Sequence, residues 1–159
     1  MNQTEQVLWI SDWAWSLPLI ILTVVIHVLG LGLLHQTLVH SLDRSTARRH
    51  PTATFIVVMG VTILVVTVLH ALEATIWAAA YRLLEALPDA RRALLYSLSS
   101  MTTYGHANLY LTEHWQLMGA MEALNGIILF GLTTAFLFGT IVRIWPVGGM
   151  VWHRESTRS

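Results

Sequence analysis

The segment from Ala93 to Thr112, ALLYSLSSMTTYGHANLYLT, decides how often this chain crosses a membrane. It contains no acidic residue and no arginine, and His106 is its single histidine. Seven serine, threonine or asparagine side chains nevertheless fall within it: Ser97, Ser99, Ser100, Thr102, Thr103, Asn108 and Thr112. Lipid does not tolerate so many polar groups, whereas a re-entrant segment that is buried in protein or lines water does. We therefore expect this segment to enter the membrane and return on the same side.

Three apolar runs surround this segment in the sequence. Residues 17–34 contain His27 as their only ionisable group, residues 53–72 contain only His70, and residues 115–142 are interrupted only by Glu122. A membrane-spanning helix needs about 20 mostly apolar residues, and all three runs meet that length closely enough. The sequence therefore predicts an all-α membrane protein with three transmembrane helices and one re-entrant hairpin.

The composition agrees with a membrane protein and excludes several other classes. The chain has 159 residues, of which 55% are hydrophobic and 11% are charged, and its mean hydropathy is +0.59. The formal net charge is zero, so the sequence carries no electrostatic footprint for nucleic acid. Phosphate-binding loops, dinucleotide-binding glycine motifs and nucleophile elbows are absent from the sequence, and we do not expect an enzyme.

Arginine placement predicts the orientation. One group lies between the first two apolar runs and another follows the third run: Arg44, Arg48 and Arg49, then Arg143, Arg154 and Arg158. Basic residues are enriched on the cytoplasmic side, and three crossings place both groups on that side. We expect an external segment at 1–16, a first transmembrane helix at 17–34, a cytoplasmic loop at 35–52 and a cytoplasmic tail at 146–159. The predicted location is the cell (inner) membrane, with the N-terminus external.

The re-entrant hairpin has a recognisable start. Pro88 and Asp89 suit the first turn and the N-cap of a helix, so the sequence predicts a helix from Ala90 to about Met101. Such a helix is roughly 18 Å long, which is enough to cross half a bilayer. Its C-terminal end carries a partial negative charge that favours a cation near the membrane centre.

The residues that follow resemble the potassium-channel superfamily of pore-loop channels. The family filter is commonly T-T-V-G-Y-G-D, and residues 102–108 of this chain are T-T-Y-G-H-A-N. The run from Glu122 to Phe136, EALNGIILFGLTTAF, is similar to the glycine-bearing inner helices of that family. The resemblance covers residues 53–145, which it makes a pore domain of outer helix, pore helix, filter and inner helix.

This resemblance implies a homotetramer in the lipid bilayer that conducts potassium or other monovalent cations, with no other cofactor. The filter carbonyls that would bind the ion belong to Thr102, Thr103, Tyr104, Gly105, His106 and Ala107. Filter support is assigned to Tyr96, Ser99, Asn108 and Glu122. The inner-helix hinge and pore lining are assigned to Gly126, Ile127, Phe130, Gly131, Thr134 and Phe138. Gating is expected through the pore itself, pH, lipid or a regulatory partner, since no voltage-sensing arginine helix is present.

The filter also departs from the family pattern. Tyr104 replaces valine, His106 replaces tyrosine, Ala107 replaces the second glycine and Asn108 replaces aspartate. Alanine resists positive φ by about 1–2 kcal/mol, so the filter is expected to have fewer ordered ion sites and weaker selectivity. A non-conducting, channel-like subunit is therefore an alternative.

The histidines suggest an alternative of a different class, a membrane haem or metal-binding redox protein. Its candidate ligands are His27, His70, His106 and His114. No metal-motif spacing is present, and His27 and His70 are expected at unequal depths, which counts against this alternative. His27 is interpreted as a packing residue. His70 and Glu73, three residues apart, are interpreted as a hydrogen-bonded pair, a proton-sensitive contact or interfacial residues.

Overall fold

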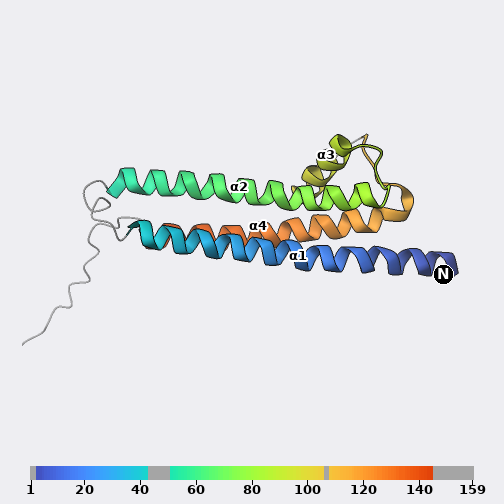
Figure 1. Cartoon of the computed structure of the whole chain (residues 1–159), viewed down its shortest axis with the longest axis horizontal. Coiled ribbons are helices and arrows are strands. Elements are labelled where there is room, and N and C mark those ends of the chain that lie inside the picture. The colour runs from blue at the N-terminus through green and yellow to red at the C-terminus, as the bar shows by residue number, and fades with distance from the viewer. Residues whose placement is uncertain (1–2, 43–50, 106–107, 145–159) are drawn as a thin grey trace, which may run out of the picture.

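The computed structural model describes residues 3–42, 51–105 and 108–144, and this part of the chain is helical without any strand. The helices are α1 (Gln3–Leu42), α2 (Pro51–Leu83), the short α3 (Ala90–Met101) and α4 (Gln116–Ile144), with a 3-10 turn, η2 (Glu113–Trp115), before α4. The long helices α1, α2 and α4 lie side by side, and α3 packs on α2 and α4 at the end of the bundle that holds the N-terminus (Figure 1). The all-α prediction is confirmed.

Three helices are long and apolar enough to cross a membrane. The candidate spans are Trp9–Val39, Thr52–Leu83 and Glu113–Arg143, which confirms the prediction of three such helices. The helices themselves are longer than the apolar runs, and α1 begins at Gln3 rather than at Leu17. Apolar runs mark the lipid-compatible part of a helix, whereas the helix continues until a cap or a break ends it.

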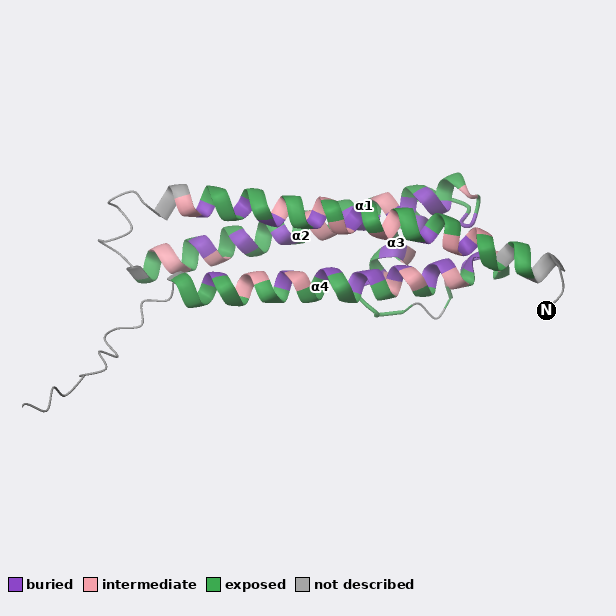
Figure 2. Cartoon of the chain, turned by 90° about the horizontal axis from the view of Figure 1, so that it is seen from below, coloured by how far each residue is buried: buried purple, intermediate pink, exposed green. Residues whose placement is uncertain are grey.

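Burial in the bundle is inverted relative to a water-soluble protein. Large apolar side chains lie on the outside, and Leu33, Ile56 and Phe130 keep 64–67% of their surface exposed. Polar side chains lie inside, where His27, Glu73, Glu122 and Asn125 have no exposed surface. Figure 2 shows the buried residues on the facing sides of the helices and the exposed residues on the outward sides. Lipid on the outside and hydrogen-bonded polar groups inside account for this distribution.

Helix α3 begins where the sequence predicts. Asp89 is extended and caps the helix, with its carboxylate accepting a hydrogen bond from Arg92 N at 2.8 Å. Arg82, in the last turn of α2, donates to the carbonyl oxygens of Leu87 and Pro88 at 2.9 and 2.7 Å. These contacts tie the connection between α2 and α3 and fix the direction in which α3 leaves. The predicted helix from Ala90 to Met101 is confirmed.

The C-terminal end of α3 lies directly on the backbone of α4. A Cβ added to Gly126 would lie 2.7 Å from Met101 Cα and 2.8 Å from Met101 C, so only glycine permits this approach. Gly126 lies ten residues after the start of α4. The turn η2 lies between the loop after α3 and the start of α4. The C-terminal end of α3 therefore lies ten residues along α4 from the start of that helix.

Candidate functional site

A buried polar cluster joins α2, α3 and α4. We call it the Glu122 cluster, and it consists of Glu122, Tyr81 and Ser97. Tyr81 Oη donates to Glu122 Oε2 at 2.7 Å, and Ser97 Oγ donates to Glu122 Oε1. Ser97 Oγ also lies 2.7 Å from Ala74 O on α2. All three members are fully buried, so Glu122 anchors the short helix against both of its long neighbours.

The residues assigned to filter support lie around this cluster at different distances. Tyr96 packs edge-on against Tyr81 with ring centroids 5.4 Å apart. Tyr96 is partly buried, and Tyr81 connects it to Glu122. Ser99 donates to Leu95 O within α3, and Asn108 is exposed. Of the four assigned residues, the structure brings Tyr96 and Glu122 together.

The loop after α3 turns back through two residues with positive φ. Thr103 has a φ of 56° and Gly105 a φ of 71°. The backbone N–H groups of 102–105 donate to the last carbonyls of α3, which belong to Leu98, Ser99 and Ser100. Tyr104 is 82% exposed. His106 and Ala107, assigned to the filter from the sequence, lie outside the described residues.

The residues assigned to pore lining form one exposed face of α4. Ile127, Phe130 and Phe138 keep 57–68% of their surface exposed, and Thr134 is exposed as well. The two assigned hinge glycines differ. Gly126 is packed against Met101, whereas an added Cβ at Gly131 would meet nothing within 4 Å. The structure thus gives Gly126 a packing role of its own.

A second buried polar cluster joins α1, α2 and α4 farther along the bundle. We call it the His27 cluster, and its members are His27, His70, Glu73 and Thr133. His27 Nδ1 lies 2.8 Å from Glu73 Oε1, and His27 Nε2 lies 3.0 Å from Thr133 Oγ1. The rings of His27 and His70 meet edge to face with centroids 5.0 Å apart. His27, His70 and Glu73 each present a ligand atom, and these atoms all lie within 4.8 Å of one another.

This cluster corrects two interpretations drawn from the sequence. The expectation that His27 and His70 lie at unequal depths is wrong, because their rings are in contact. Glu73 is fully buried, and it is hydrogen-bonded to His27 rather than to His70, so the expected His70–Glu73 pair is wrong. The expected depths were taken from the positions of the histidines within their apolar runs. Helix α1 starts 14 residues before its run, so the position of a residue within a run does not give its position along the bundle. The sequence did indicate that such contacts exist, because each apolar run contains one isolated ionisable group. An isolated ionisable group in a membrane needs a polar partner on another helix.

A third link holds α1 to α4. Asn125 Nδ2 donates to Thr23 Oγ1 at 2.8 Å, and both side chains are fully buried. Thr23 in turn donates to Leu19 O at 2.9 Å within α1. Neither Thr23 nor Thr133 was singled out from the sequence, because threonines are frequent in transmembrane helices and their partners lie more than 100 residues away.

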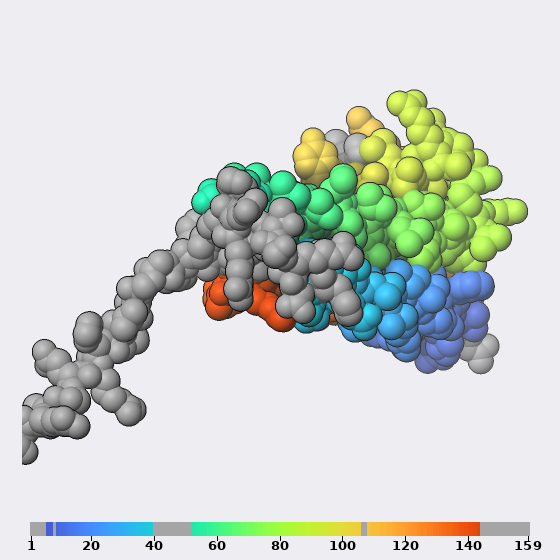
Figure 3. Space-filling model, turned by 60° about the vertical axis from the view of Figure 1, so that its left-hand side comes forward, coloured from blue at the N-terminus to red at the C-terminus, as the bar shows by residue number. Residues whose placement is uncertain are grey.

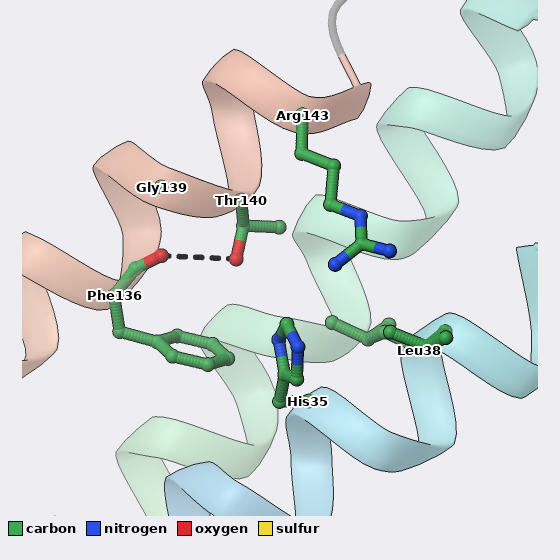
Figure 4. Close-up of a pocket in the computed structure, with 7 residues that line it drawn as sticks. His35, Leu38, Phe136, Gly139, Thr140 and Arg143 are labelled. Carbon is green, nitrogen blue, oxygen red and sulfur yellow. Dashed lines mark hydrogen bonds between the residues drawn. The ribbon is translucent and has the colours of Figure 1, made fainter.

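Two surface features complete the description. The residues of α3 and its neighbouring loop form a raised layer over one side of the bundle (Figure 3). Toward the other end, α1 and α4 border a hollow of about 250 Å³, in which the Arg143 side chain points toward His35 and the His35 ring lies beside Phe136 (Figure 4). The remaining lining residues are Leu38, Val39, Gly139 and Thr140. This hollow shares no residue with either polar cluster.

Comparison of the chain with models of protein families, with curated protein sequences and with solved structures finds no match.

Proposed function

We propose that four copies of this chain form a monovalent cation channel, with potassium as the expected ion and residues 102–107 as the filter. One observation carries the proposal: a short polar helix lies between two candidate spans and ends ten residues deep along α4, where its loop turns back. In a membrane, irregular backbone at this depth is tolerated where it is buried in protein or lines water. A pore between neighbouring copies supplies that water.

The electrostatics of this arrangement suit a cation. The C-terminal end of α3, which carries a partial negative charge, meets the loop at Thr102. The N–H groups of 102–105 donate back to α3, so the loop can offer carbonyl oxygens without competing donors from these residues. A dehydrated cation needs oxygen ligands in place of its water shell. One loop offers too few of them, so the proposal requires a closed ring of chains.

In such a ring, neighbouring chains would contact one another through side chains that are exposed in the single chain. Tyr104 on the loop and Ile127, Phe130 and Phe138 on α4 are all more than half exposed. In the proposed tetramer the α4 residues line the cavity below the filter, and Phe138 forms an apolar constriction that gates by dewetting. The proposed orientation puts the N-terminus outside, in the cell membrane. It is supported by the C-terminal ends of α1 and α4 and the N-terminal end of α2, which lie at the bundle end opposite α3 (Figure 1).

The test is ion flux from liposomes that contain the purified chain. We expect flux of potassium, smaller flux of sodium and none of a large organic cation. Gly105→Ala should reduce the flux, because alanine disfavours the positive φ that Gly105 adopts. Gly60→Ala is the matched control, since an added Cβ there meets nothing within 4 Å. A monomeric particle without flux, or equal flux for Gly105→Ala and the native chain, would contradict the proposal.

The orientation has a separate test. Tags placed at the C-terminus and in the 35–52 loop should both be detected on the cytoplasmic side. Detection on opposite faces would mean an odd number of crossings between them, and the re-entrant hairpin would then be a fourth span.

A further inference from the structure

We propose that the His27 cluster binds a divalent transition-metal ion such as Zn²⁺, with His27, His70 and Glu73 as its protein ligands. Its three protein ligands belong to one chain, and none of them is a filter residue. Two imidazoles and one carboxylate form a ligand set that zinc accepts, with a fourth position left for water. Their ligand atoms already lie within 4.8 Å of one another, so binding requires only small movements of side chains.

Two buried atoms in the cluster lack the partner that burial demands. Glu73 Oε2 and His70 Nε2 are buried without a hydrogen-bond partner among the described residues. A buried polar atom without a partner costs about 1–3 kcal/mol. Glu73 is also fully buried, and His27 donates to only one of its two oxygens. A bound cation would satisfy both orphaned atoms at once.

The hydrogen bonds around the cluster prepare His70 to act as a ligand. His70 Nδ1 lies 3.0 Å from Val66 O. A carbonyl oxygen only accepts hydrogen bonds, so Nδ1 must carry the proton and donate it to Val66 O. In the neutral ring, Nε2 then holds a free lone pair, which is the form that binds a metal. A second-shell carbonyl of this kind fixes the tautomer and the ring orientation of a ligating histidine.

Hydrogen bonds also fix the orientation of the His27 ring, with Glu73 of α2 on one side and Thr133 of α4 on the other. In the neutral tautomer that carries its proton on Nδ1, Nδ1–H donates to Glu73 Oε1 and Nε2 accepts from the Thr133 hydroxyl. Metal binding requires the other neutral tautomer, in which Nε2–H donates to Thr133 Oγ1 and the Nδ1 lone pair faces the metal. The proton therefore moves from one nitrogen of the ring to the other, and the charge of His27 does not change.

One ligand of the cluster, His70, borders a hollow. His70 lines a hollow of about 310 Å³, together with Thr102 and Thr103 of the loop and with Gly126, Ile127 and Phe130 of α4. A hollow of this size has room for water beside His70. A metal in this place would cross-link α1 to α2, since His27 belongs to α1 and the other two ligands belong to α2.

The test uses the full chain in detergent, stripped with a chelator and then titrated with Zn²⁺, or with Co²⁺ as a spectroscopic probe. We expect one tightly bound ion per chain, an intense tetrahedral Co²⁺ absorption and a higher unfolding temperature with Zn²⁺. His70→Gln and Glu73→Gln should each weaken binding at least tenfold. His35→Gln, which removes an exposed histidine of the same chain, should bind like the native protein.

Equal binding by the native chain, His70→Gln and Glu73→Gln would mean that other histidines hold the ion adventitiously, and it would overturn the proposal. Absence of a stoichiometric ion in the native chain would do the same. His70→Gln protects the test against misfolding, because His70 is only partly buried and its Nε2 has no partner to lose. None of these measurements depends on ion flux, so a failed metal site and a failed channel give different results.

Discussion

Replacing Gly126 with alanine should separate α3 from α4. The new Cβ would lie 2.7 Å from Met101 Cα and 2.8 Å from Met101 C, and the Met101 carbonyl oxygen is also in its way. Carbon atoms in contact normally lie about 3.5–4.0 Å apart, so the two backbones must move apart by roughly 1 Å. All three obstructing atoms are backbone atoms, so no change of rotamer can relieve the overlap. Overpacking of this kind costs about 1–3 kcal/mol.

The matched control for this substitution is Gly131→Ala, five residues farther along α4. An added Cβ at Gly131 meets nothing within 4 Å, so it brings the helix preference of alanine without the overlap. Because that preference, about 0.8–1.0 kcal/mol, is common to both variants, their difference reports the overlap alone. We expect the free energy of unfolding of Gly126→Ala to lie about 1–3 kcal/mol below that of Gly131→Ala.

The assay is reversible unfolding of the purified chain in mixed micelles, followed by circular dichroism and tryptophan fluorescence. Because the proposed filter follows α3 directly, Gly126→Ala should also reduce the ion flux from liposomes. The flux through Gly131→Ala tests separately whether the proposed hinge affects gating. Equal stability of the two variants would refute the reasoning, since it would mean that α3 does not rest on the backbone of α4.

Two further substitutions test the buried polar links. Tyr81→Phe leaves Glu122 Oε2 without its donor, and it should lower the free energy of unfolding by about 1–3 kcal/mol in the same micelle assay; an unchanged midpoint would contradict the anchoring role of the cluster. Thr23→Val removes the acceptor of Asn125 and should cost about 0.6–1.7 kcal/mol. Thr67→Val is its control, since Thr67 is exposed and donates within its own helix. If Thr67→Val lowered the free energy of unfolding as much as Thr23→Val, the link between α1 and α4 would contribute nothing to stability.

Much of the fold was predictable because it depends on local composition. A membrane span needs only an apolar run of sufficient length, so three such helices followed from residues 17–34, 53–72 and 115–142. The start of α3 followed from Asp89, because an N-cap acts on backbone groups within the next turn. The polar residues between Ala93 and Thr112 indicated a segment that lipid cannot surround, and the structure packs α3, which holds the first part of this segment, against α2 and α4.

Contacts between helices were not predictable in the same way. The sequence showed that His27, His70, Glu73 and Glu122 were isolated polar groups in apolar surroundings, and each therefore needed a partner. Which partner each one found depends on how far one helix slides along another, and that is set by side chains far apart in the sequence. Tertiary structure alone decided that Glu73 meets His27, that Glu122 meets Tyr81 and Ser97, and that Gly126 lies beneath the end of α3.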